Sequence, residues 1–79
     1  MALSAADRAL IEAVPLCGPK TADYLALAGV TRFDDLADFD AATLRLAINA
    51  ALGRPHINAM GVRAIQNAID AAKARRAGR

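Results

Sequence analysis

The sequence contains few aromatic residues, cysteines or histidines. It has no tryptophan, two phenylalanines, one tyrosine, one cysteine and one histidine. A single cysteine excludes a disulfide within the chain, and one cysteine with one histidine is too few for a structural zinc site. Because large aromatic side chains are scarce, the core must be built from leucine, isoleucine and valine between closely packed helices.

Long apolar runs, signal-peptide features and catalytic patterns are also missing. No stretch of about 18 apolar residues is present to span a membrane, and Asp7 and Glu12 make the N-terminus acidic where a signal peptide is basic. We therefore expect a cytoplasmic protein without membrane contact. The sequence shows no Ser-His-Asp order, glycine-rich nucleotide loop or histidine pair. We expect a binding module without enzymatic activity or cofactor.

The residues that are present favour an all-α fold in one domain. The chain has 79 residues, of which 56% are hydrophobic, and alanine supplies much of that fraction. This length suits a single domain, and alanine is the best helix former. Apolar residues at three- and four-residue spacing predict five helices. They cover residues 4–13, 19–28 and 33–37, the segment between Asp40 and Gly53, and a last segment that begins within 57–61 and ends near 76.

Capping residues determine the predicted ends of these helices. Ser4 and Asp40 are favoured N-cap residues, and Gly29 and Gly53 are typical C-terminal stops. The predicted core residues share the helical spacing and are Leu3, Ala6, Leu10, Ile11, Ala13, Val14, Ala22, Leu25, Val30, Phe33, Leu36, Phe39, Leu44, Ala47, Ile48, Ala51, Ile65, Ala68, Ile69 and Ala72.

Charge is distributed unevenly, although the net charge is only +2. Seven of the eight acidic residues lie within residues 1–40, and seven of the ten lysines and arginines lie within 41–79. This asymmetry allows a basic face toward nucleic acid or an acidic partner. It equally allows the two halves to attract each other, within the monomer or between subunits. The acidic run from Asp34 to Asp40 lacks the spacing of a calcium loop, so we interpret it as helix capping.

The most informative segment is residues 14–30. A tight turn leads into Gly18, and Pro19 presets the backbone for the first turn of a helix. The free amides and the dipole at a helix N-terminus attract a phosphate, and Lys20 and Thr21 add a charge and a hydroxyl beside them. The pattern predicts a small anion cradle. The alternative is that Lys20 is solvated and Thr21 caps the helix.

This segment resembles the helix-hairpin-helix motif of DNA-binding proteins, in which an apolar residue, proline, glycine, an apolar residue and glycine precede a helix with an early alanine. The matching residues are Pro15, Cys17, Gly18, Lys20 and Ala22. Leu16 stands where the family usually has its first glycine. The resemblance implies that the amides of Leu16 and Gly18 approach one DNA phosphate, often through a bound monovalent cation.

The order of elements over residues 8–72 is similar to that of the small bacterial pathogenicity-locus and mitomycin-resistance proteins, a stand-alone helix-hairpin-helix group. The resemblance includes the turn that starts at Gly53 and continues Arg54-Pro55-His56. It implies one tandem helix-hairpin-helix (SAM-like) domain over residues 1–79. The first hairpin is expected at about 4–28, the connector helix at about 32–37 and the second hairpin at about 40–76.

The function implied is non-enzymatic binding of DNA through its backbone phosphates, without sequence preference. The candidate contacts are Leu16, Gly18, Lys20 and Thr21 at the first hairpin, and Arg54, Gly61 and Arg63 at the second. A homodimer would present both hairpins twice and strengthen the binding.

Two alternatives stay open. A SAM-like protein-interaction module uses the same architecture, and both Leu16 and the charge asymmetry favour it. Cys17 is interpreted as an apolar residue of the hairpin, because free cysteine is among the most buried residue types. Its other interpretation is a redox-sensitive thiol near a helix N-terminus.

Overall fold

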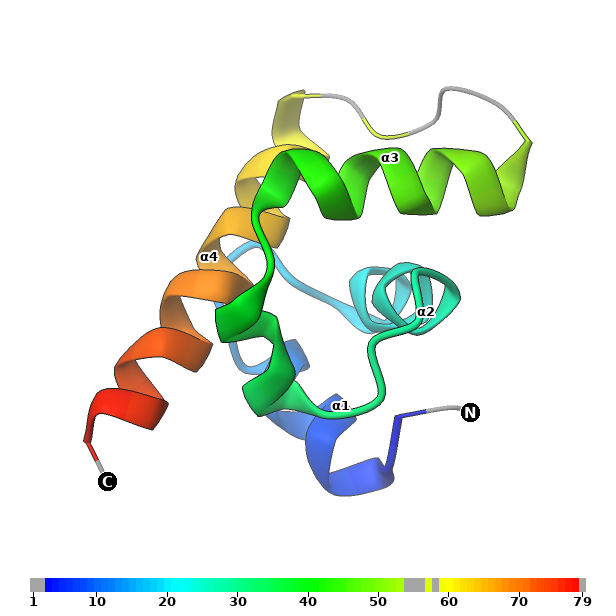
Figure 1. Cartoon of the computed structure of the whole chain (residues 1–79). Helices are drawn as coiled ribbons and strands as arrows, with labels where there is room; N and C mark the ends of the chain where they lie inside the picture. Colours follow the sequence, from blue (N-terminus) through cyan, green and yellow to red (C-terminus); the bar gives the residue numbers. More distant parts are fainter. Residues whose placement is uncertain (1–2, 54–56, 58, 79) are drawn as a thin grey trace.

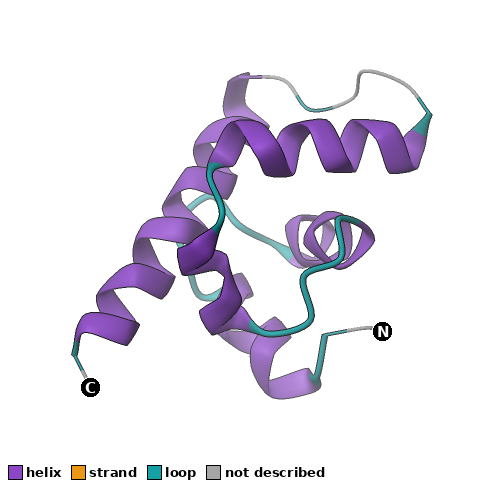
Figure 2. Cartoon of the chain, in the orientation of Figure 1, coloured by secondary structure: helices purple, strands orange, loops and turns teal. Residues whose placement is uncertain are grey.

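A computed structural model describes residues 3–53, 57 and 59–78, and all its regular elements are helices (Figure 2). In chain order they are α1 (Ala5–Glu12), α2 (Pro19–Leu27), the short 3-10 helix η1 (Phe33–Asp38), α3 (Ala41–Leu52) and α4 (Ala59–Ala77). The predicted all-α class and the five helices are confirmed.

Side-chain caps and glycines terminate these helices where the sequence predicts. The Ser4 Oγ accepts a hydrogen bond from the Asp7 amide at 3.1 Å, and the Asp40 Oδ1 accepts one from the Thr43 amide at 2.7 Å. Gly53 ends α3 with φ +74°, in the left-handed region that glycine enters without strain. Each cap satisfies a backbone group that the helix itself leaves unpaired.

The core lies between α4 and the other helices. In Figure 1, α3 crosses the N-terminal part of α4, α2 is seen end-on beneath α3, and η1 lies along the C-terminal half of α4. The largest fully buried side chains are Ile11, Leu25, Val30, Leu36, Leu44, Ile48 and Ile69. All seven belong to the predicted core.

Three alanines of the predicted core are exposed: Ala6, Ala13 and Ala51. The prediction was wrong because alanine favours a helix by its backbone preference alone, and so its spacing says little about burial. Leu10, Phe39 and Ala47 are only half-buried.

The acidic and basic halves of the chain meet within one molecule. The Arg76 guanidinium forms a two-pronged pair with the Asp38 carboxylate, at 2.8 and 3.1 Å. Arg75 Nε lies 3.2 Å from Asp34 Oδ1. These pairs join the last turns of α4 to η1. They are an attraction between the two halves within the monomer, which is one of the interactions that the charge asymmetry allows.

Within the described ranges, no helix combines the length and the hydropathy that crossing a bilayer requires.

Candidate nucleic-acid interface

The turn between α1 and α2 adopts an unusual backbone conformation at Leu16. Its φ is +71°, and it is the only non-glycine residue with a positive φ in the described part of the chain. The amide of Cys17 closes the turn by donating to the Val14 carbonyl at 3.0 Å. Left-handed backbone costs a residue with a Cβ about 1–2 kcal/mol. The leucine therefore occupies a conformation for which glycine is the usual choice.

The turn is held against α4 by two further contacts. The Asn67 Nδ2 donates to the Pro15 carbonyl at 2.9 Å, and the Cys17 Sγ lies 3.2 Å from the Ala64 carbonyl oxygen. These contacts fix the residues on both sides of Leu16. Leu16 itself remains 55% exposed.

Arg63 precedes the two α4 residues that contact this turn. It stands one residue before Ala64 and one helical turn before Asn67, and residues four apart share a face of a helix. Its side chain is exposed. The structure thus places one candidate of the second hairpin one helical turn from an α4 residue that contacts the first.

The N-terminus of α2 presents backbone amides beside Leu16. Pro19 has no N–H, and the amides of Lys20 and Thr21 precede the first hydrogen bond of the helix. None of the described residues accepts from those two amides or from the Leu16 amide. The Gly18 amide makes a long 3.5 Å bond to the Thr21 Oγ1, so the threonine hydroxyl caps this helix end.

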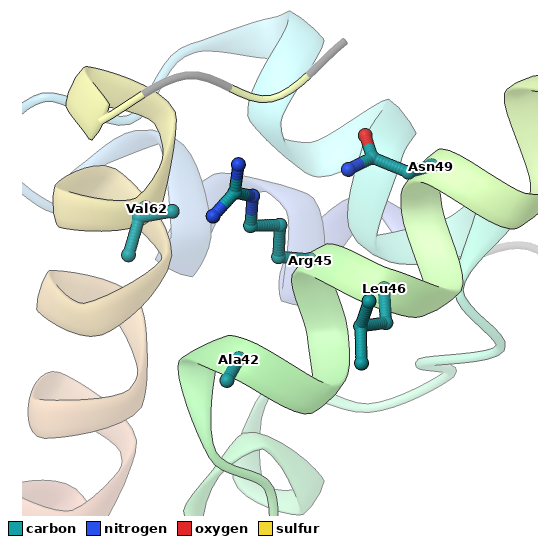
Figure 3. A pocket seen from close by; sticks show the side chains of 5 residues that line it. All are labelled: Ala42, Arg45, Leu46, Asn49 and Val62. Carbon is teal, nitrogen blue, oxygen red and sulfur yellow. The ribbon is translucent and has the colours of Figure 1, made fainter. Parts of the chain in front are cut away.

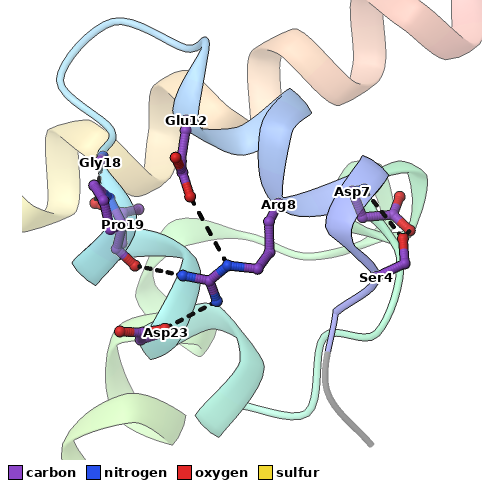
Figure 4. A network of polar contacts seen from close by, with 8 residues as sticks. Ser4, Asp7, Arg8, Glu12, Gly18, Pro19 and Asp23 are labelled. Atoms are coloured by element: carbon purple, nitrogen blue, oxygen red, sulfur yellow. Dashed lines mark hydrogen bonds and ion pairs between the residues drawn. The ribbon is translucent and has the colours of Figure 1, made fainter.

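Arg8 pairs with two carboxylates near the first hairpin, those of Glu12 and Asp23 (Figure 4). Its guanidinium lies 2.9 Å from Asp23 Oδ1 and 3.8 Å from Glu12 Oε2, and it donates to the Pro19 carbonyl at 3.3 Å. Arg8 therefore ties α1 to α2. Lys20 is exposed and has no carboxylate partner among the described residues.

The other candidates of the second hairpin are placed less completely. Gly61 lies inside the first turn of α4, because the helix already begins at Ala59. Arg54 lies outside the described residues. The first hairpin, Arg63 and Gly61 therefore constitute the candidate site that the structure positions.

Two carbonyls of the first turn accept hydrogen bonds within the protein. The Val14 carbonyl accepts one from the Cys17 amide, and the Pro15 carbonyl accepts one from Asn67. No group of three His, Cys, Asp or Glu side chains that could hold a metal ion occurs among the described residues.

Cys17 is half-buried, and its thiol faces the Ala64 carbonyl. Burial raises the pKa of this thiol above its ordinary value of 9.0, which disfavours the nucleophilic thiolate. The environment agrees with a packing residue of the hairpin.

A groove between α3 and α4 was not predicted from the sequence. It has a volume of about 440 Å³, and its lining residues are Ala42, Arg45, Leu46, Asn49 and Val62 (Figure 3). Leu46 is 70% exposed. The sequence signal for this exposure was the position of Leu46 next to Arg45 and outside the buried stripe that contains Leu44 and Ile48.

Comparison with known proteins gave no match among family models, curated proteins or solved structures.

Proposed function

We propose that this protein binds nucleic acid through backbone phosphates, without sequence preference. The observation that carries the proposal is the Leu16 backbone, whose left-handed φ of +71° supplies the turn conformation that the motif normally obtains from glycine. The leucine therefore does not prevent the hairpin from presenting its amides. Three amides without acceptors among the described residues lie in this hairpin, at Leu16, Lys20 and Thr21.

The charge distribution around the hairpin supports the proposal. The carboxylates of Glu12 and Asp23 interact with Arg8. Lys20 and Arg63 remain exposed and have no carboxylate within 4 Å among the described residues. Such cations add a sequence-independent attraction to phosphate.

The test is fluorescence anisotropy of a labelled DNA duplex at low salt, with a Lys20→Glu, Arg63→Glu double variant. We expect binding by the wild type and loss of binding by this variant. The matched control is Arg32→Glu, Lys73→Glu, which changes the net charge equally at exposed positions away from the hairpin. Equal loss of binding in both variants, or no binding by the wild type, would contradict the hairpin interface.

A protein-interaction module is the second candidate, and the groove between α3 and α4 favours it. The groove exposes Leu46 beside Arg45, the only charged residue of α3. An apolar segment that carries a carboxylate would match both side chains. This alternative predicts that Leu46→Asp abolishes partner binding and leaves DNA binding unchanged.

A further inference from the structure

Leu16 combines two properties that the folded monomer does not require. Its backbone is left-handed, and this apolar residue is more than half exposed to solvent. A glycine in the same turn would avoid both costs. Strain of this kind persists only where the surrounding structure over-determines it, and it gathers at functional sites.

The surroundings of Leu16 hold it in a defined position. Pro15 is bonded to Asn67 through its carbonyl, and Cys17 is bonded to Val14 and contacts Ala64. The leucine thus projects from a turn that is fixed to α4 on both sides. A side chain projecting from a fixed turn loses little conformational freedom when a partner covers it.

The neighbours of Leu16 identify the chemistry of that partner. Lys20 is exposed in the first turn of α2, four residues after Leu16. Arg63 is exposed one helical turn before Asn67, whose side chain bonds the Pro15 carbonyl. The unpaired amides beside Leu16 favour an anion. An apolar side chain between phosphate-binding groups is the arrangement of proteins that insert a wedge between bases.

We propose that Leu16 is a wedge that fills a break in the base stack, and that the protein therefore prefers gapped DNA to continuous duplex. This inference rests on the proposed phosphate binding. Wedging into an intact duplex requires unstacking, which a domain with so few phosphate contacts is poorly able to drive. At a gap the stacking is already lost, so the leucine can cover an exposed base face without that cost.

The experiment compares an intact duplex with the same duplex carrying a one-nucleotide gap. We expect wild-type protein to bind the gapped duplex about tenfold more tightly, which corresponds to about 1.4 kcal/mol. A 2-aminopurine placed beside the gap reports directly on insertion, because its fluorescence changes when a side chain contacts or displaces the base.

Two variants test the side chain. Leu16→Gly and Leu16→Ala should lose the preference for the gapped over the intact duplex, measured as the ratio of the two affinities of each variant, since the apolar contact contributes at the gap alone. Leu16→Ala keeps a Cβ in the turn, so agreement between the two variants separates the side chain from turn flexibility. The matched control is Leu27→Ala, which removes another exposed leucine from the same helix pair and should keep the preference.

The outcomes separate this inference from the proposed function. Equal binding of gapped and intact duplex by wild type overturns the wedge and retains phosphate binding. A preference that survives in both Leu16 variants also overturns the wedge. Failure of wild type to bind either DNA overturns both proposals. In that case, self-association that disappears in Leu16→Gly would assign the residue to a protein interface.

Discussion

Leu16 is where the residue type and the backbone conformation disagree most. A left-handed backbone destabilises the folded protein by about 1–2 kcal/mol when the residue carries a Cβ. A glycine destabilises it by about 0.5–1 kcal/mol, because the unfolded chain has more conformational freedom to lose on folding. The first term is larger, so we expect Leu16→Gly to raise the free energy of unfolding by about 0.5–1 kcal/mol. Urea denaturation measures this, and Leu16→Ala, which keeps the strained φ, should show no such gain. A glycine variant less stable than the alanine variant would contradict the left-handed turn.

Cys17, the next residue, gives a second test at this scale. Its half-buried thiol faces the Ala64 carbonyl, and burial raises its pKa, so little thiolate forms near pH 7. We expect a disulfide reagent such as DTNB to react with the folded protein at least about tenfold more slowly than with the protein in urea. Equal rates in the two states would instead support the redox-sensitive interpretation of this thiol.

At the scale of elements, the sequence predicts helix boundaries better than it predicts surfaces. Ser4, Asp40 and Gly53 act through local hydrogen bonds or local φ values, which a short stretch of sequence determines. The packing of α3 on α4 depends on contacts between distant segments, so the groove between them could not be predicted, although the exposure of Leu46 could have been. The left-handed turn at Leu16 was also beyond local preference, because leucine rarely adopts it. Its only signal was its place where the motif that this segment resembles usually has a glycine.

Asp7 links two elements, α1 and η1. Its carboxylate accepts hydrogen bonds from the Ser4 hydroxyl at 2.6 Å and from the Phe33 amide at 3.0 Å, and these bonds lower its pKa below 3.8. A lowered folded pKa gives stabilisation that is complete above the unfolded pKa and disappears as pH falls through the folded value. We expect Asp7→Ala to lower the free energy of unfolding by about 1 kcal/mol at pH 7.

The electrostatic part of that loss should shrink below pH 3.8, which urea titrations at pH 7 and pH 3 would measure. Asp35→Ala is the matched control. Asp35 also lies in η1, and its side chain makes no hydrogen bond with any of the described residues. If Asp7→Ala lowers the free energy of unfolding equally at both pH values, the effect comes from the helix cap alone.

At the scale of the whole molecule, α4 separates two electrostatic regions. Arg63 lies near its start and Arg75 near its end, about 18 Å apart at the rise of an α-helix. The cations of the last turns pair with Asp34 and Asp38 of η1. Two of the acidic side chains of η1 are thereby paired away from the first hairpin, and a net charge of only +2 is compatible with a locally cationic binding face.

This separation predicts that the position of a cation decides its contribution to DNA binding. With about two to four phosphate contacts, the logarithm of the binding constant should fall against the logarithm of salt concentration with a slope of about −2 to −3.5. Lys20→Gln removes one exposed cation beside the hairpin and should reduce the magnitude of that slope by about 1. Arg76→Gln removes the same charge from a residue already paired with Asp38, and should leave the slope unchanged. Anisotropy titrations over a salt series measure both slopes. Equal changes of slope in the two variants would mean that DNA binding depends on the total charge of the protein and not on the hairpin. A local interface responds to an unpaired cation beside it, and does not respond to a distant cation that is paired with a carboxylate.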